Sequence, residues 1–170
     1  MFVTIAEKIV MIFTLGLLFV TMTSSAQGSP RSELKQMMLK LQPAMDWKTV
    51  QNLSGALLQL PVEDRELAIA IAFQECSLLP KSSVCQSSVD KGLFQFSPST
   101  IRELRMNPRL LNGRNLKYEV RHYKKWMAVK KKMCKKKYYH TWFACWNSAS
   151  FKNHYRYATY IFKHLNKLRK

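Results

Sequence analysis

The sequence of 170 residues lacks several patterns that would point to other architectures. It has no long low-complexity stretch, no internal repeat and no convincing strand pattern. Apolar residues make up 47% of the chain, which excludes a disordered protein and is enough for one compact domain. Apolar residues recur at helical spacing along most of the chain. These features together predict a single all-α domain.

Acidic residues are also scarce, with ten Asp or Glu against 28 Lys or Arg and a formal net charge of +18. Such an excess favours a polyanionic partner, namely nucleic acid, an anionic membrane face or an acidic wall polymer. Eight lysines crowd the stretch from Lys124 to Lys137. A charge run of this kind is most often a solvated helix face. Its functional interpretation is attraction to an anionic wall polymer or membrane surface.

The N-terminal segment has the features of a secretion signal. An apolar run from Ile9 to Val20 follows Lys8, and small residues lead up to Ala26. We therefore predict a signal peptide over residues 1–26, cleaved after Ala26, and a secreted or periplasmic domain over residues 27–170. An uncleaved membrane anchor is the alternative, but the run is shorter than the roughly 20 residues that a spanning helix needs. Secretion argues against a nucleic-acid partner.

Four cysteines lie in the mature part of the chain, and an even number in an oxidising compartment predicts two disulfides. We favour local pairing, Cys76 with Cys85 and Cys134 with Cys145. A zinc site is the competing interpretation, although its spacings match no common zinc pattern; its ligands would be Cys134, His140, Cys145 and His154. We expect no metal and no cofactor.

Helices are expected over residues 32–41, 46–60, 62–76, 98–107, 115–133, 138–149 and 153–168. The second of them would begin at Asp46 as its N-cap and turn Trp47 inward. The third is apolar on nearly every side, which is typical of a central helix. Glu75 lies at the C-terminal end of this helix, where the helix dipole tends to raise the pKa of a carboxyl group. That position favours an acid catalyst.

Elimination also favours Glu75. A carboxyl group that acts as an acid catalyst near neutral pH needs apolar surroundings, which raise its pKa. Most other acidic residues lie at predicted helix ends, and Glu103 and Glu119 lie among Arg and Lys. Only Glu75 and Asp90 border the serine-rich loop and the Gly-Leu-Phe-Gln segment that follows it. Asp90 is the candidate second carboxylate, and an ordinary solvated loop residue is its alternative interpretation.

Four short motifs in order carry a resemblance to a known family. Glu75 ends a buried helix, and Gly92-Leu-Phe-Gln95 follows a loop. Ala144-Cys-Trp-Asn147 and then Tyr160 come later. This order is similar to that of the soluble lytic transglycosylases, which belong to the lysozyme-like group with the goose-type lysozymes. Two departures are Cys76, where the family has Ser, and Ser148, where a Gly is common.

The resemblance implies a lysozyme-like helical fold, a monomer and a peptidoglycan substrate. It implies Glu75 as general acid/base, and substrate-binding residues Phe94, Gln95, Trp146, Asn147 and Tyr160. Amide side chains suit the acetamido and hydroxyl groups of sugars, and a Tyr hydroxyl, with Tyr160 the candidate, would hold Glu75. Phe96 would add an apolar wall, while Trp142 and Phe143 are expected in the core.

The implied reaction cleaves the β-1,4 bond between N-acetylmuramic acid and N-acetylglucosamine. The C6 hydroxyl of the muramic acid attacks and leaves a 1,6-anhydro end. One alternative is a hydrolytic lysozyme in which Asp90 assists a water molecule. Another is a catalytically inactive cationic protein that binds wall or membrane.

Overall fold

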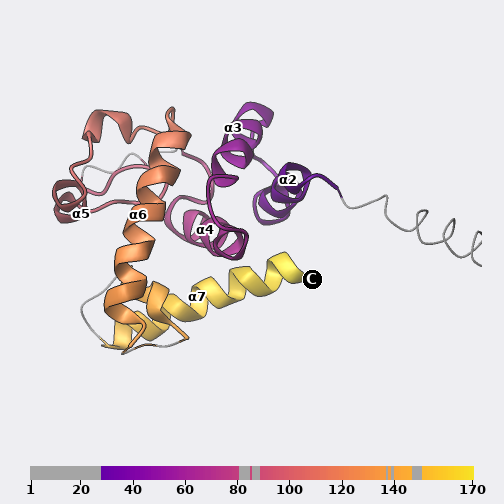
Figure 1. Cartoon of the computed structure of the whole chain (residues 1–170). Coiled ribbons are helices and arrows are strands. Elements are labelled where there is room, and N and C mark those ends of the chain that lie inside the picture. The colour runs from indigo at the N-terminus through magenta and orange to yellow at the C-terminus, as the bar shows by residue number, and fades with distance from the viewer. Residues whose placement is uncertain (1–27, 81–84, 86–88, 137, 139, 147–150) are drawn as a thin grey trace, which may run out of the picture.

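The computed structural model describes residues 28–80, 85, 89–136, 138, 140–146 and 151–170. Helices make up most of this part of the chain and it contains no strand, which confirms the all-α prediction (Figure 1). None of the helices in these residues is long and apolar enough to cross a membrane. The predicted signal peptide, residues 1–26, lies outside the described residues.

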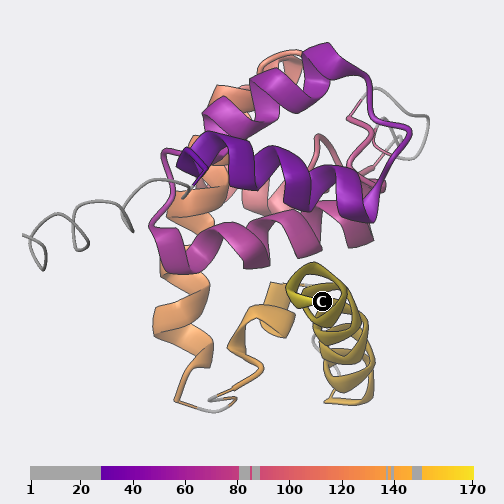
Figure 2. The same ribbon diagram turned by 90° about the vertical axis from the view of Figure 1, so that its right-hand side faces the viewer.

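The first two described helices form a pair on one side of the molecule (Figure 2). They are α2 (Pro30–Leu41) and α3 (Trp47–Leu57). Asp46 caps α3 as predicted, because its carboxylate accepts a hydrogen bond of 2.9 Å from the backbone N–H of Thr49. The prediction that Trp47 turns inward is wrong, since this residue is 63% exposed. It is the first residue of the helix, and its ring lies 4.7 Å from the ammonium group of Lys35.

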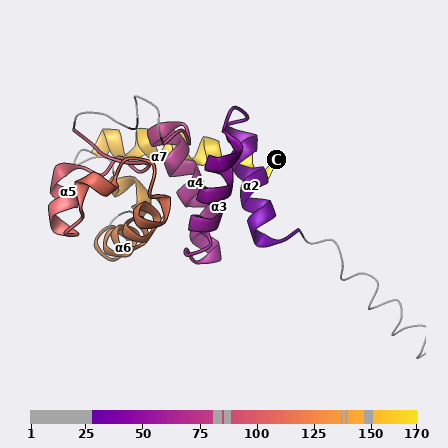
Figure 3. The same cartoon turned by 90° about the horizontal axis from the view of Figure 1, so that it is seen from above.

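Helix α4 (Val62–Cys76) is the central element, and it contacts both α2 and the last helix, α7 (Phe151–Arg169). Seen from above, it lies between the α2–α3 pair and the side of the molecule formed by α5 (Pro98–Glu103) and α6 (Leu116–Cys134) (Figure 3). Residues 68–72 are buried on every side, as the sequence predicted. The helix ends because Ser77 and Leu78 adopt left-handed conformations, with φ of 52° and 57°. Glu75 therefore lies in the last helical turn.

Two further helices follow the serine-rich segment. Helix α5 (Pro98–Glu103) begins at the expected residue, after Ser97 as its N-cap, but it ends earlier than the expected helix over residues 98–107. A 3-10 turn (Pro108–Leu110) leads to α6 (Leu116–Cys134), which is capped by Asn115. Helix α6 contacts α3, and it also contacts the 3-10 segment (Trp142–Trp146) that follows it in the chain.

The expected helix over residues 138–149 is wrong in the described part of that range. A 3-10 segment (Trp142–Trp146) stands there, preceded by turns. The disulfide Cys134–Cys145 explains why no α-helix forms there. It holds the two Cα atoms 6.4 Å apart, so the 3-10 segment folds back on α6. The last helix, α7 (Phe151–Arg169), extends from this end of α6 back towards α2 (Figure 1).

Both predicted disulfides are present, Cys76–Cys85 and Cys134–Cys145. The alternative zinc site is wrong, because two of its four proposed ligands are consumed by the second disulfide. Within the described residues, no group of three or more His, Cys, Asp or Glu is arranged to hold a metal ion.

Candidate functional site

A pocket of about 200 Å³ lies at the C-terminal end of α4. It brings together both carboxylates that the sequence singled out, Glu75 and Asp90, with Gln95. The rest of its lining comes from the segment entering α5 and from the middle of α6; these residues are Phe96, Ser97, Thr100 and Trp126. Residues distant in sequence thus meet around one carboxyl group on a central helix.

Glu75 is held by a tyrosine of α7. The hydroxyl of Tyr157 donates a hydrogen bond of 2.6 Å to Glu75 Oε1. Tyr157 is only 7% exposed, and burial, followed by the charge of Glu75, raises the pKa of its hydroxyl well above the usual range. The hydroxyl therefore remains protonated and acts as a donor to the carboxylate.

We expected this contact from Tyr160, and the structure places Tyr157 there instead. Tyr160 lies one helical turn later and is 41% exposed. Tyr160 is offset from Tyr157 by about 60° around the helix axis, on the side away from Ile161, so it lies at the exposed edge of the face that Tyr157 helps to bury. Tyr157 shares its face with Ile161, which is fully buried. This apolar spacing, rather than the motif, was the signal that could have found Tyr157.

The segment from Lys91 to Phe96 forms a tight turn that presents Gln95 to the pocket. Lys91 and Phe96 exchange two backbone hydrogen bonds of 3.0 and 2.8 Å. The turn needs left-handed conformations at Gly92 (φ 78°) and Gln95 (φ 46°). Glycine is required at the first position, because a Cβ atom there would lie 2.7 Å from a carboxylate oxygen of Glu119.

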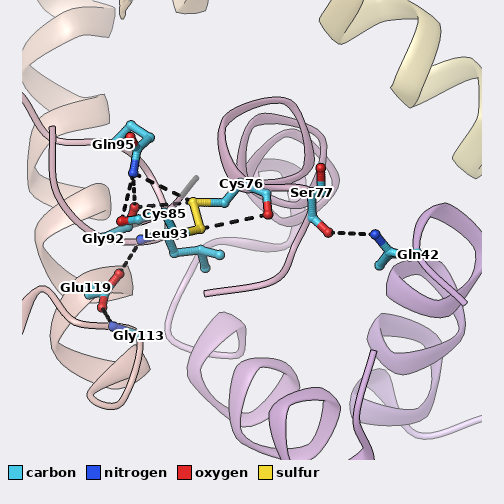
Figure 4. Close-up of a disulfide and its surroundings, with 9 residues drawn as sticks. All are labelled: Gln42, Cys76, Ser77, Cys85, Gly92, Leu93, Gln95, Gly113 and Glu119. Carbon is cyan, nitrogen blue, oxygen red and sulfur yellow. Dashed lines mark hydrogen bonds between the residues drawn. A yellow bond between two sulfur atoms is a disulfide. The ribbon is translucent and has the colours of Figure 1, made fainter. Parts of the chain in front are cut away.

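Gln95 is tied to the first disulfide, as Figure 4 shows. Its amide nitrogen donates to the carbonyl oxygens of Gly92 (2.8 Å) and Cys85 (3.1 Å) and lies 3.7 Å from Cys76 Sγ. Because the nitrogen is engaged with these acceptors, a ligand in the pocket would meet the carboxamide oxygen. The disulfide joins the residue next to Glu75 to one of the acceptors that fix Gln95.

The sequence did not reveal the role of Glu119, which holds the turn that carries Gln95. Its side chain is fully buried and accepts hydrogen bonds from the backbone N–H groups of Leu93 (2.6 Å) and Gly113 (2.9 Å), both visible in Figure 4. Burial raises the pKa of this carboxyl group, although both hydrogen bonds act in the opposite direction. Its spacing from Leu116 and Tyr123, three and four residues away, places it on the apolar face of α6. That spacing was the available signal.

The aromatic residues divide between the core and the pocket. The expectation that Phe94 contacts substrate is wrong, because it is fully buried and stacks on Tyr123 with ring centroids 4.1 Å apart. Phe143 is buried as predicted. Trp126, which the sequence did not suggest for the site, lines the pocket, and the Lys130 ammonium lies 4.3 Å from its ring.

Two candidate residues cannot be placed. Asn147 lies outside the described residues, as does the side chain of Trp146. Comparisons with protein-family models, curated proteins and solved structures found no match to this chain.

Chemically, the described site offers one carboxyl group with a fixed donor and a second carboxyl group in the same pocket. It also offers an amide and an aromatic wall. This combination suits proton transfer to or from a polar ligand, because a positioned carboxyl group can give and take a proton.

Proposed function

We propose that this protein is a secreted enzyme that cleaves the glycan strands of bacterial peptidoglycan, with Glu75 as general acid/base. The observation that carries the proposal is the Glu75 carboxyl group, held at 2.6 Å by a buried Tyr157 and lining a pocket with Gln95. The four ordered motifs that resemble the soluble lytic transglycosylases support it.

In the proposed reaction, the protonated Glu75 gives its proton to the glycosidic oxygen between N-acetylmuramic acid and N-acetylglucosamine. The bond from that oxygen to C1 of the muramic acid breaks. Glu75, now a carboxylate, takes the proton of the C6 hydroxyl as its oxygen bonds to C1. The products are a free 4-hydroxyl on one fragment and a 1,6-anhydro ring on the other, and no water is consumed.

The residues around Glu75 would divide the remaining work. Tyr157 would stabilise the carboxylate form that appears after the first proton transfer, because hydrogen bonds to a charged acceptor are stronger than neutral ones. The carboxamide oxygen of Gln95 would accept from an acetamido or hydroxyl group. Trp126 would face a sugar ring.

Asp90 supports a second candidate, the hydrolytic lysozyme. It lines the same pocket as Glu75, so a water molecule between the two carboxyl groups would attack C1 instead of the C6 hydroxyl. The two candidates differ in their products by one water molecule.

The test is mass spectrometry of the fragments released from purified peptidoglycan by the protein and by its Glu75→Gln variant. Removing a general acid/base is expected to slow release by about 10²–10⁴-fold. The matched control is Glu33→Gln, the same change at an exposed position on α2, and it should release fragments at the wild-type rate.

Anhydro ends that depend on Glu75 would support the transglycosylase, and reducing ends that depend on Glu75 would support the lysozyme. Equal release by wild type and Glu75→Gln would contradict any role for this residue. If no fragments are released at all, the catalytically inactive cationic protein becomes the better account.

A further inference from the structure

The exposed face of α7 carries positive charge and aromatic rings side by side. Arg156, Lys163 and Lys167 follow one another at helical spacing along the exposed side of this helix, and the exposed Lys170 comes directly after its last residue. Phe162 and Tyr160, which flank this row, are 42% and 41% exposed. The helix contains no acidic residue, and the opposite side, which includes Ile161 and Leu165, is buried.

Contacts with the rest of the molecule leave this charge largely uncompensated. The one salt bridge found in the described part of α7 joins Arg169 to Glu66, at 3.0 Å. Lys163, Lys167 and Lys170 instead border a groove of about 790 Å³, which Phe73 and Phe162 also line. A basic rim around apolar side chains complements an amphiphilic anion.

We propose that the exposed face of α7 docks the protein on an anionic lipid bilayer. Lysine and arginine near an anionic membrane surface are attracted to its headgroups, and aromatic side chains favour the boundary between headgroups and acyl chains. The helix would lie in the plane of the interface, with its basic row against the headgroups and its exposed aromatic side chains inserted beside them.

The aromatic residues favour a bilayer over a soluble anionic polymer. Charge alone would attract either partner, but Phe162 and Tyr160 gain free energy only where apolar surface can leave water. Helix α6 is the natural comparison, because its Lys117, Lys125 and Lys132 are exposed too.

The test measures partitioning of the full chain onto vesicles of phosphatidylcholine alone and of phosphatidylcholine mixed with phosphatidylglycerol. The N-terminal apolar run is common to all variants, so the ratio between the two vesicle types isolates the charged surface. Replacing Lys163, Lys167 and Lys170 together by Gln is expected to lower partitioning onto the anionic vesicles on the order of a hundredfold. Circular dichroism verifies that each variant is folded.

The matched control replaces Lys117, Lys125 and Lys132 by Gln, which removes the same charge from α6. Its partitioning should fall much less than that of the α7 variant. Equal losses in the two triple variants, or no loss in either, would overturn the proposal in favour of diffuse attraction or of no membrane binding.

A second variant tests the aromatic contribution at unchanged charge. Phe162→Ser is expected to lower partitioning roughly threefold to tenfold, and the effect should persist at high salt because it does not depend on charge. Tyr160→Ser repeats the test at a residue on the other side of the basic row. If neither substitution changes partitioning, the bilayer proposal fails and a soluble anionic polymer becomes the better partner.

Discussion

All ten acidic residues of the chain lie at or before Glu119, whereas the residues from Val120 to Lys170 include fifteen Lys or Arg and no Asp or Glu. In the first region, acidic side chains make individual contacts. Glu75 accepts from Tyr157, and Glu119 accepts from two backbone N–H groups. In the second region, positive charge repeats along exposed helix faces. Among the charged residues, single substitutions should therefore matter at Glu75 and Glu119 in the first region, whereas only grouped substitutions should matter in the second.

Helix α7 is where the comparison is least simple, because its two faces belong to different tasks. Its buried face supplies Tyr157 to the carboxyl group on α4, and its exposed face carries the basic row. A charge-rich surface helix can thus also be part of the proposed catalytic site. What distinguishes the two regions is therefore whether a residue lies on a buried or an exposed helix face, and not only its position in the sequence.

The largest effect on stability is expected for Glu119→Ala. The change leaves the backbone N–H groups of Leu93 and Gly113 buried without an acceptor, at a cost of about 1–3 kcal/mol each. We therefore expect the free energy of unfolding to fall by about 4 kcal/mol, measured by chemical denaturation. Glu103→Ala, at an exposed position, should change it by less than about 0.5 kcal/mol. Equal effects of the two substitutions would contradict the supporting role of Glu119.

The two disulfides provide a sharper comparison between the regions. Their sequence separations are 9 and 11 residues, so replacing either pair by Ser is expected to cost a similar amount, about 2.5 kcal/mol. Only Cys76–Cys85 lies against Gln95 and beside Glu75. Under conditions where both variants remain folded, release of peptidoglycan fragments should fall in the Cys76/Cys85 variant and stay near wild type in the Cys134/Cys145 variant. The reverse order would show that the first disulfide does not position the site.

Tyr157→Phe tests the contact by which the second region reaches the Glu75 carboxyl group of the first. It removes the donor to Glu75 while keeping the ring, and the loss of a hydrogen bond to a charged group predicts a fall in fragment release of about tenfold or more. Tyr160→Phe is the matched control, since this residue is exposed, and it should leave the rate unchanged. A larger effect at Tyr160 would restore the role that the sequence motif suggested for it.

The sequence could predict those parts of the structure that depend on local pattern. The N-cap at Asp46, the helix starts at Pro98 and near Asn115, and the buried helix that ends near Glu75 follow from residue type and spacing. Local disulfide pairing was likewise predictable from short separations. These features need no knowledge of which segments meet in space.

The missed features depend on long-range contacts. Glu119 looked solvated beside Arg121, yet it binds a turn 26 residues earlier in the chain. Phe94 belongs to a motif that suggested substrate contact, but Tyr123 from α6 covers its ring. The helix expected over residues 138–149 had suitable propensity, and the Cys134–Cys145 link overrode it in the described part. In each case a partner distant in sequence decided the outcome.

The smallest predicted effect is a pH dependence that separates burial from hydrogen bonding at Glu119. Burial raises the pKa of this group above its ordinary value of 4.5, so the folded protein holds the proton more tightly than the unfolded chain does. The stabilisation that results is fully present below pH 4.5 and is lost as pH rises through the folded-state pKa.

Glu119→Gln cannot titrate, so the free energy of unfolding of wild type minus that of this variant should decrease as pH rises from 4.5 towards neutrality. Glu103→Gln, the same change at an exposed position on α5, provides the control for the loss of a carboxyl group as such. An increase with pH for Glu119→Gln would mean that the N–H groups of Leu93 and Gly113 stabilise the carboxylate by more than burial destabilises it. The group that holds the Gly92 turn would then be the Glu119 carboxylate, rather than the protonated carboxyl group, near neutral pH.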